Sequence, residues 1–287
     1  MERITGKTEL IGLIATPIKH SNSPRMQNEA FAKVGADYCY LAFDVTPDKF
    51  PEAVAGLKAL GARGFNISMP YKMEIIKYLD ELSPAAEMIG AVNTVINECG
   101  KYIGHNTDGY GFCQALRMHN IDFSGKKAVL IGPGGAGTAI SVQSALDGLG
   151  ELIIYSRGGK TYPRAQQLVK MLNEKTTCKA YLRLMDDEEQ MKQDILGSDL
   201  LINSTGIGMG AFEGQSVIKD ESVFHEGLVV FDAIYSPPKT KLLEQAEAHG
   251  CRAISGIDML LWQGARCFEL WTGKNFPMNE IRPMFVK

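Results

Sequence analysis

A glycine-rich segment in the middle of the chain has the residue types and spacing that bind a phosphate. Gly132-Pro133-Gly134-Gly135-Ala136-Gly137 follows the apolar run 128–131 and precedes a helical pattern over 139–149. The first glycine permits a tight turn, the second admits a pyrophosphate, and the third lets the helix pack on the strand. The alternative is an ordinary glycine turn, which the flanking strand and helix disfavour. We predict a dinucleotide site at Gly132, Gly134, Gly135, Ala136 and Gly137.

Four polar segments carry a second kind of chemistry. Three of them lie near expected strand ends, where α/β folds bind ligands. Together they supply hydroxyls, carboxamides, an ammonium and a carboxylate, a set that suits a small, hydroxyl-rich substrate bearing a carboxylate. The segments are Lys19-His20-Ser21-Asn22-Ser23-Pro24, Asn66-Ile67-Ser68-Met69-Pro70-Tyr71-Lys72, Gly90-Ala91-Val92-Asn93-Thr94 and Asn106-Thr107-Asp108-Gly109.

Each of these residues also has a plainer interpretation. Ser21 and Ser23 either cap a helix or bind a ligand, and one residue can do both. Lys72 is either a functional group or a solvated surface lysine. Asp108 and Asn93 also suit turns or caps. The residues alone do not show whether these side chains converge.

The elements around these segments indicate two α/β domains. After the glycine loop, apolar runs alternate with helical stretches, which predicts a parallel sheet with helices on both faces. Its further strands are expected at 152–155, 180–184, 200–203, 228–232 and 251–254.

The N-terminal part predicts a mixed sheet. Strands are expected at 10–14, 38–43 and 64–69, with a hairpin at 93–105. Helices should begin at Ser23-Pro24, with Ser23 as N-cap, and at Thr46-Pro47, while Ser83-Pro84 should cap a short one. Residues 66–72 should end the third strand and start a helix. The last strong helical pattern covers 258–271.

Composition excludes several classes of protein. The 287 residues suit two domains. A net charge of −3 gives no footprint for nucleic acid. No apolar run is long enough to span a membrane, and the N-terminus lacks a signal-peptide core. The six cysteines and five histidines form no metal motif, so we expect no metal and a cytoplasmic protein.

The polar segments and the glycine loop occur in an order that resembles the shikimate dehydrogenase family, close to its quinate/shikimate branch. The resemblance covers nearly the whole length. Three further segments carry it: Asn203-Ser204-Thr205, Asp232-Ala233-Ile234-Tyr235-Ser236-Pro237 and Met259-Leu260-Leu261-Trp262-Gln263-Gly264-Ala265.

This resemblance implies a fold and an activity. Residues 1–110 and 257–287 should form an α/β substrate-binding domain with a mixed sheet. Residues 111–256 should form an inserted Rossmann-like NAD(P)-binding domain with a doubly wound parallel sheet. The implied enzyme is an NAD(P)-dependent oxidoreductase that reversibly reduces 3-dehydroshikimate to shikimate. Its partner would be that small molecule, with no nucleic acid or membrane, in a monomer or homodimer.

The resemblance also assigns roles to residues. Lys72 and Asp108 match the catalytic pair, with Lys72 as acid/base. Ser21 and Ser23 match the hydroxyls that hold the substrate carboxylate. The remaining matches are Ser68, Asn93, Asp108 and Gln263 at the ring hydroxyls, Tyr235 as a site tyrosine, and Thr205 and Gly256 on the cofactor side.

The residues about 20 positions past the glycine loop favour NADP. NAD-selective folds place an acidic residue there to bind the ribose 2′-hydroxyl. This chain has Ser156-Arg157-Gly158-Gly159-Lys160, with two cations and no acid. Arg157 suits a 2′-phosphate. Because some relatives in this branch use NAD, dual use stays open, and we assign Ser156, Arg157 and Lys160 to the cofactor.

Three functions are compatible with these residues. The first is shikimate dehydrogenase. The second is a quinate/shikimate dehydrogenase that also uses NAD. The third is a non-catalytic ligand sensor, which the presence of both Lys72 and Asp108 disfavours. Asp258 stands where many relatives carry glycine, which leaves the contact with the nicotinamide open.

Overall fold

A computed structural model describes residues 4–19, 21–159 and 161–286. The chain divides into two compact units. The first unit comprises Met1–Thr107 and Gln263–Lys287, and the second comprises Asp108–Trp262. No helix among the described residues is long and apolar enough to cross a membrane.

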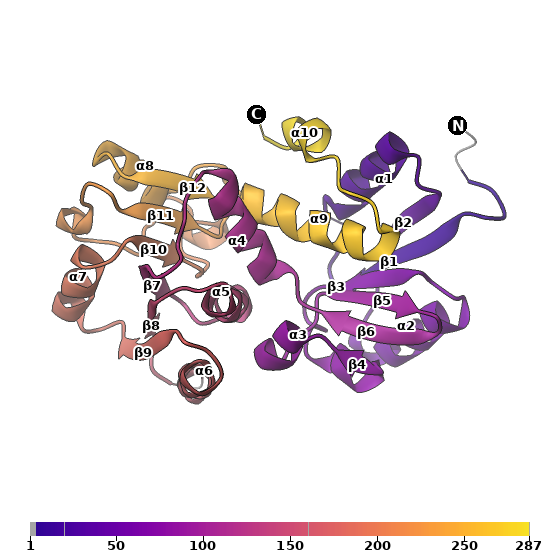
Figure 1. Ribbon diagram of the computed structural model, residues 1–287, viewed down its shortest axis with the longest axis horizontal. Coiled ribbons are helices and arrows are strands. Elements are labelled where there is room, and N and C mark those ends of the chain that lie inside the picture. The colour runs from indigo at the N-terminus through magenta and orange to yellow at the C-terminus, as the bar shows by residue number, and fades with distance from the viewer. Residues whose placement is uncertain (1–3, 20, 160, 287) are drawn as a thin grey trace. The chain divides into compact units, whose positions relative to one another are not determined.

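The first unit is built on a mixed six-stranded sheet in the order β2-β1-β3-β5-β6-β4 (Figure 1). β1 pairs in parallel with β2 and β3, whereas β5 is antiparallel to β3 and β6. The predicted mixed sheet is confirmed. The strands are β1 (Glu9–Ala15), β2 (Tyr38–Asp44), β3 (Gly64–Ile67), β4 (Glu81–Leu82), β5 (Thr94–Glu98) and β6 (Lys101–His105).

Helices pack on this sheet through apolar side chains. Phe50 and Tyr71, both buried, stack with ring centroids 4.1 Å apart in the core. Helices α1 and α9 are joined by a hydrogen bond, which Gln27 of α1 donates to the carbonyl of Gly264 in α9 at 2.9 Å. The helices are α1 (Ser23–Val34), α2 (Phe50–Ala59), α3 (Pro84–Ile89), α10 (Met278–Ile281) and the second part of α9 (Ile257–Thr272), with short 3-10 turns η1 (Pro47–Lys49), η2 (Glu74–Tyr78) and η5 (Arg282–Met284).

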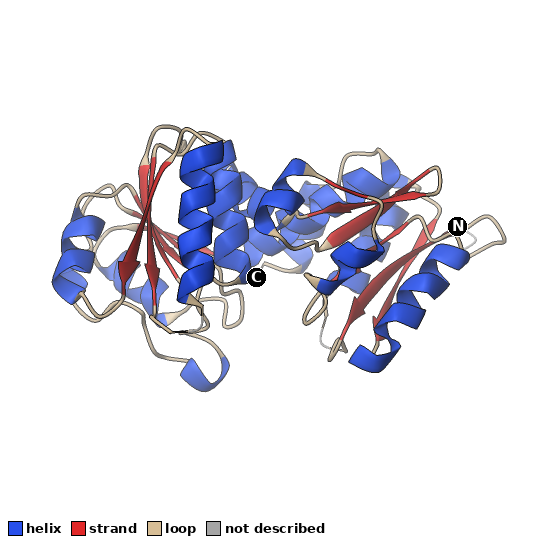
Figure 2. Ribbon diagram, turned by 90° about the horizontal axis from the view of Figure 1, so that it is seen from below, coloured by secondary structure: helices blue, strands red, loops and turns tan. Residues whose placement is uncertain are grey.

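The second unit has a fully parallel sheet in the order β12-β11-β10-β7-β8-β9. Helices cover both of its faces (Figure 2), with α5 and α6 on one side and α7 on the other (Figure 1). Its four inner strands, β7, β8, β10 and β11, are apolar and largely buried, as a sheet covered on both sides requires, whereas the edge strands β9 and β12 are partly exposed. The strands are β7 (Lys127–Ile131), β8 (Glu151–Ser156), β9 (Lys179–Leu184), β10 (Leu200–Asn203), β11 (Val229–Asp232) and β12 (Arg252–Ser255).

This strand order is that of a Rossmann fold, so the predicted doubly wound domain is confirmed. The order reverses between β7 and β10, and the glycine loop follows β7 at that point. The helices of the unit are α4 (Asp108–Met118), α5 (Gly135–Leu146), α6 (Tyr162–Lys175), α7 (Glu188–Leu196) and α8 (Lys241–Ala248), with η3 (Gly210–Phe212) and η4 (Glu221–Val223).

Several expected boundaries were wrong. The N-cap of α1 is Asn22, so Ser23 is the first helical residue and not the cap. β3 ends at Ile67, and Lys72 lies in a turn because the next helical turn begins only at Glu74. Helix α5 ends at Leu146, before the expected limit of 149.

Candidate functional site

Polar segments of the first unit lie at one end of its sheet. Ile14 of β1 lies beside Ile67 of β3 in parallel register, so both strands end at this edge. Thr94 lies opposite Asn66 in the antiparallel pair, so β5 begins there, and β6 ends there with His105 opposite Thr94. The predicted segments adjoin these strand ends at 66–72, 90–94 and 106–107, while 21–24 forms the start of α1.

Backbone hydrogen bonds fix three of the predicted residues at this edge. The Ser68 N–H donates to the carbonyl of Ile14 at 3.0 Å. The Lys72 carbonyl accepts from the Val92 N–H at 2.7 Å, and the neighbouring Asn93 carbonyl accepts from the Ile67 N–H at 2.8 Å. The backbones of Ser68, Lys72 and Asn93 are therefore held together by strand pairing and by the turn that follows β3.

Asn93 is almost fully buried, with 4% of its surface exposed, and hydrogen bonds to Thr94 and Thr107 hold its side chain. Its Oδ1 accepts from the Thr107 N–H at 2.9 Å and from the Thr94 hydroxyl at 2.9 Å. Its Nδ2 donates to the Thr107 hydroxyl oxygen at 3.0 Å. These hydrogen bonds fix the orientation of the carboxamide. They also hold Thr107, which follows β6 and precedes Asp108.

Helix α9 brings Gln263 to the same group. The Thr107 hydroxyl lies 3.5 Å from Gln263 Oε1. One helical turn on, the buried Cys267 thiol contacts the hydroxyls of Thr94 at 2.9 Å and Thr107 at 3.3 Å. In the first unit the structure thus brings together Ser68, Asn93 and Gln263 with the backbone of Lys72. We call these four residues, which lie where β1 and β3 end, the sheet-edge group.

The two serines at the start of α1 have different local roles. Ser21 Oγ accepts from the Ser23 N–H at 3.2 Å, which stabilises the turn before the helix. Ser23 is the first helical residue of α1 and follows the N-cap Asn22. The capping interpretation is therefore wrong for Ser23, whereas the local interpretation holds for Ser21.

Asp108 is the first residue of α4 and not a turn aspartate. The glycine that follows it is required by helix packing. A Cβ at Gly109 would lie 2.2 Å from the Ala139 carbonyl oxygen of α5, so a larger residue would push the two helices apart. This close packing of α4 on α5 positions Asp108 in the second unit.

The glycine loop of the second unit fits a dinucleotide. Gly132 has a φ of +94° and makes the tight turn after β7. A Cβ at Gly137 would lie 2.2 Å from the Gly132 carbonyl oxygen, so helix and strand meet there. Gly134 and Gly135 are exposed, and a Cβ at either would meet no atom within 4 Å. The backbone is therefore open where a phosphate must approach.

The start of α5 has the electrostatics that an anion needs. Gly134 is the N-cap and has no side chain to occupy the helix end, and no acidic residue lies in the first turn. The unpaired N–H groups and the dipole of a helix N-terminus both favour a negative charge.

Thr205 lies against this loop. Its Cγ2 would be 2.5 Å from a Cβ at Gly132. Ser204, to which the sequence analysis gave no role, donates its hydroxyl hydrogen to the carbonyl of Gly132 at 2.7 Å. Asn203 Oδ1 accepts from the Thr205 N–H at 3.0 Å and orients that residue.

The end of β8 lies next to the loop, because the Gly132 N–H donates to the Tyr155 carbonyl at 2.9 Å. Ser156 is buried and its hydroxyl donates to the Arg157 carbonyl at 3.0 Å, which shapes the turn. Arg157 is exposed. Lys160 lies outside the described residues.

Gly256 and Tyr235 follow the other strands of the sheet. A Cβ at Gly256 would lie 2.3 Å from the Ala233 carbonyl oxygen, so only glycine fits where these two loops touch. Tyr235 is 43% exposed in the loop after β11. Its role toward the substrate stays a prediction.

Asp258, the departure noted in the sequence, has a structural partner. Its carboxylate is buried and lies 2.9 Å from Nε2 of His119, just after α4. The acid therefore joins the start of α9 to the end of α4 within the second unit.

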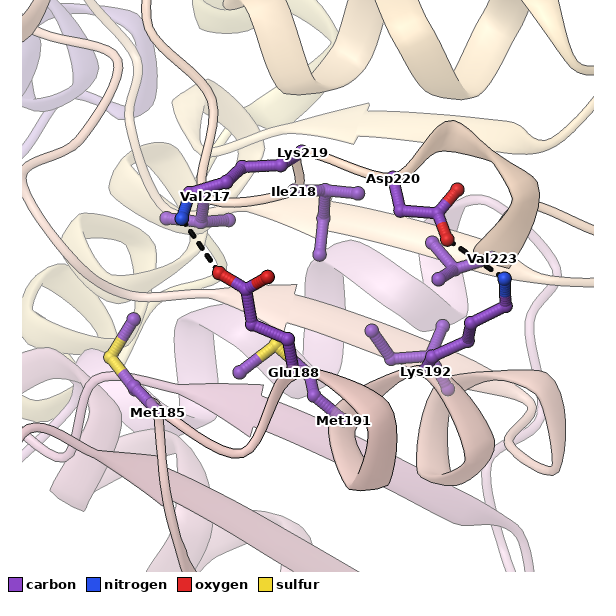
Figure 3. Close-up of a pocket in the computed structure, with 10 residues that line it drawn as sticks. Met185, Glu188, Met191, Lys192, Val217, Ile218, Lys219, Asp220 and Val223 are labelled. Atoms are coloured by element: carbon purple, nitrogen blue, oxygen red, sulfur yellow. Dashed lines mark hydrogen bonds and ion pairs between the residues drawn. The ribbon is translucent and has the colours of Figure 1, made fainter.

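A hollow beside α7 is a different feature (Figure 3). Its rim carries two ion pairs, Lys219 with Glu188 at 2.7 Å and Lys192 with Asp220 at 2.8 Å, above apolar side chains. The ten described residues that line it include none of the predicted site residues. Among the described residues, no cluster of three His, Cys, Asp or Glu is placed to hold a metal.

Sequence reasoning missed the buried residues that support the sheet-edge group. Tyr40 and Cys267 lie in ordinary strand and helix patterns, and no local signal marks them. Asn66 and Thr107 were inside quoted segments, and only the register shows that their side chains point into the same network.

Two family models match the chain. The substrate binding domain of shikimate dehydrogenase matches residues 13–95, and the C-terminal domain of shikimate 5'-dehydrogenase matches residues 256–282. Both matches include residues of the sheet-edge group, at Ser68 and Gln263.

Whole-length relatives agree with these models. The chain is 51% identical over 281 residues to a shikimate dehydrogenase (NADP(+)) of Listeria innocua, covering 98% of this chain and 97% of that protein. It is 45% identical over 279 residues to a quinate/shikimate dehydrogenase of Escherichia coli, covering 97% of each. A crystal structure of shikimate 5-dehydrogenase from Listeria monocytogenes, in complex with shikimate and NAD, matches with a TM-score of 0.97 at 50% identity, covering 99% of this chain and 98% of that one. The chain belongs to the shikimate dehydrogenase family.

Proposed function

We propose that this protein catalyses the reversible, NADP-dependent reduction of 3-dehydroshikimate to shikimate. The observation that carries the proposal is the whole-length identity of 51% with an enzyme of that name, and the family resemblance assigns Lys72 and Asp108 as its catalytic pair. The sheet-edge hydroxyls and carboxamides are the groups that a polyhydroxylated ring acid requires.

We assign the substrate to the first unit. Ser21 and Ser23 hold the carboxylate, while Ser68, Asn93 and Gln263 hydrogen-bond the ring hydroxyls. Tyr235 and Asp108, from the second unit, are assigned to the substrate as well. The hydrogen bonds that orient the Asn93 carboxamide support this, because a carboxamide with a fixed orientation presents a defined donor and acceptor.

Lys72 carries the proton transfer in this proposal. The nicotinamide, when bound, exchanges a hydride with the carbon that bears the reacting oxygen. In reduction the Lys72 ammonium donates its proton to the ketone oxygen, and in oxidation the amine removes the proton from the hydroxyl. Asp108 orients the lysine and accepts a hydrogen bond from a substrate hydroxyl.

We assign the cofactor to the second unit. The N–H groups at Gly135 and Ala136 bind the pyrophosphate, with Gly132, Gly134 and Gly137 shaping the loop. Arg157 and Lys160 bind the 2′-phosphate, and Ser156 supports their turn. Thr205 and Gly256 contact the rest of the dinucleotide. The exposure of Arg157 and the lack of an acid after β8 favour NADP.

The experiment that tests the proposal is a set of four initial rates. Shikimate and quinate are each oxidised with NADP and with NAD, and the appearance of reduced nicotinamide is followed. We expect shikimate with NADP to give the highest kcat/KM. Binding of shikimate without turnover in any combination would contradict the proposal and identify a sensor.

A second candidate is a quinate/shikimate dehydrogenase with dual cofactor use. Its supporting observation is the 45% identity with the Escherichia coli enzyme of that name. The Gly158-Gly159 turn also leaves room beside Arg157, because neither glycine places a side chain there. Turnover of quinate, or of NAD, at a rate within about tenfold of that for shikimate and NADP would favour this candidate.

A further inference from the structure

His119 is bonded to both ends of the segment that carries Gly256, a residue that the proposed function assigns to the cofactor. His119 directly follows α4 in the second unit. Its carbonyl accepts a hydrogen bond from the Arg252 guanidinium at the start of β12. Its Nε2 lies 2.9 Å from the Asp258 carboxylate in the first turn of α9. One residue therefore holds segment 252–258 before and after Gly256.

The end of α4 is a rigid support for this segment. The His119 N–H donates to the carbonyl of Leu116 at 3.0 Å, so the helix still holds the residue. Further back in α4, Phe112 packs edge-on against Phe231 of β11 with ring centroids 4.7 Å apart, and both rings are buried. The close approach of Gly109 to α5 fixes the start of the same helix. A group bonded to His119 is therefore held relative to the parallel sheet.

Gly256 has little freedom of its own between the two ends of the segment. Its N–H donates to the carbonyl of Ile234 at 3.1 Å, and its carbonyl accepts from the Leu260 N–H at 3.0 Å. The second of these hydrogen bonds closes the first turn of α9, which also contains Asp258. Any movement of that turn therefore moves Gly256.

The Asp258 carboxylate is the part of this turn that most needs a partner. Its side chain is 5% exposed, and a carboxylate loses its hydration when it is buried, so it requires hydrogen-bond donors. An imidazole with a hydrogen on Nε2 supplies one. The contact between His119 and Asp258 therefore stabilises one arrangement of the first turn of α9.

We propose that His119 is a positioning residue for cofactor binding, which holds Gly256 in place through Asp258. This inference rests on the proposed function, because it assumes that Gly256 contacts the dinucleotide. His119→Ala removes the imidazole but keeps the backbone carbonyl that Arg252 binds. The Asp258 carboxylate then loses a donor, and the first turn of α9 loses this attachment to α4.

The first test measures the dissociation constant for NADP by calorimetry, without substrate, in wild type and in His119→Ala. We expect the constant to rise about threefold to tenfold, the effect of one hydrogen bond. In the shikimate assay the KM for NADP should rise as well, while the KM for shikimate should stay unchanged, because all residues in these contacts belong to the second unit. An unchanged dissociation constant for NADP would overturn the proposal.

His249→Ala is the matched control. His249 follows α8 as His119 follows α4, and the two side chains are 37% and 35% exposed. The Nδ1 atom of His249 lies 3.7 Å from the Glu221 carboxylate, and neither α8 nor η4 contains a predicted site residue. General destabilisation of the second unit would raise the dissociation constant for NADP in both variants. The proposal requires the rise in His119→Ala alone.

His119→Gln tests the hydrogen-bond donor itself. The amide nitrogen of glutamine reaches the position of the imidazole Nε2 and can donate to Asp258. We expect this variant to bind NADP within about twofold of wild type, since one hydrogen bond is kept. Binding as weak as that of His119→Ala would assign the effect to packing of the ring and overturn the proposal.

A double-mutant cycle with Asp258→Ala shows whether His119 acts through that residue. If it does, His119→Ala should raise the dissociation constant for NADP much less in the Asp258→Ala background than in wild type. Independent, multiplicative effects would overturn the proposal while the proposed function stands.

Failure of the proposed function would have a different signature. If the wild type bound NADP without oxidising shikimate or quinate, the proposed dehydrogenase activity would fail. The cycle is measured from dissociation constants, so it would still decide whether His119 positions the cofactor site. Absence of any binding of NADP or NAD to the wild type would overturn both.

Discussion

The glycine loop of the second unit and the sheet-edge group of the first unit face ligands with different parts of the chain. The loop, residues 132–137, presents backbone N–H groups, and its side chains are absent where a phosphate must approach. The sheet-edge group presents side chains whose orientation depends on a buried network through Tyr40, Asn66 and Thr107. Ligand binding at the loop depends on space that no side chain occupies, whereas binding at the sheet-edge group depends on hydrogen bonds that orient side chains. Substitutions in the two regions should therefore have different effects.

Lys72→Ala should give the largest effect on activity, and it should affect catalysis at the sheet-edge group without affecting cofactor binding at the glycine loop. Loss of the proton donor is expected to lower kcat by about 10²–10⁴-fold. The dissociation constant for NADP should stay within about twofold of wild type, because the loop that binds it is unchanged. Initial-rate assays measure kcat, and a cofactor titration measures the dissociation constant for NADP.

Lys77→Ala is the control for this variant. Lys77 is exposed on the 3-10 turn η2, five positions along the same segment, and has no role in the proposed site. Its removal should leave kcat near wild type. Near-normal turnover of Lys72→Ala would remove the lysine from the mechanism.

The same contrast explains what the sequence could predict. The glycine loop is six consecutive residues between one strand and one helix, so its function is visible locally. The sheet-edge group draws on residues as far apart as Asn93 and Gln263, and only hydrogen bonds through Thr107 show that they meet. Helix α4 was missed as well, because Asp108-Gly109 has the composition of a turn, and the glycine is explained only by the approach of α5.

Gly137→Ala should give the next largest effect. The new methyl group would lie 2.2 Å from the Gly132 carbonyl oxygen, which is backbone and cannot rotate away. Overpacking of this kind costs about 1–3 kcal/mol of the free energy of unfolding. It should also distort the loop and weaken NADP binding, while a shikimate titration should be unaffected. Wild-type stability measured by denaturant unfolding would show that strand and helix are not in close contact here.

Gly134→Ala tests the opposite property of the same loop. Its Cβ meets no atom within 4 Å and its φ of −75° suits alanine, so the free energy of unfolding should change by less than about 0.5 kcal/mol. The methyl group nevertheless occupies the face through which the pyrophosphate must approach. We expect a higher KM for NADP at constant Tm. An unchanged KM would mean that the phosphate does not contact this glycine.

Substitution of His105 should give the smallest effect, a change in how stability and shikimate binding, but not NADP binding, depend on pH. It ends β6 opposite Thr94, and its Nε2 is buried without a hydrogen-bond partner among the described residues. Burial, assisted by the charge of Arg266 and opposed by Glu98, lowers the pKa of the imidazole below its ordinary value of 6.5. Below pH 6.5 the unfolded chain therefore binds this proton more readily than the folded one does, so stability falls as the pH falls.

His105→Gln removes this titration and should flatten the acid side of the stability profile, measured as Tm between about pH 5 and pH 8. The glycine loop contains no titratable side chain, so the variant should not change how the dissociation constant for NADP depends on pH. The KM for shikimate in the wild type should rise on acidification more than it does in His105→Gln, because His105 lies beside Thr94 of the buried network. A parallel acid loss of stability in both proteins would assign the pH sensitivity to another group. A change confined to NADP binding would contradict the distinction between a glycine loop that binds through its backbone and a sheet-edge group that binds through its side chains.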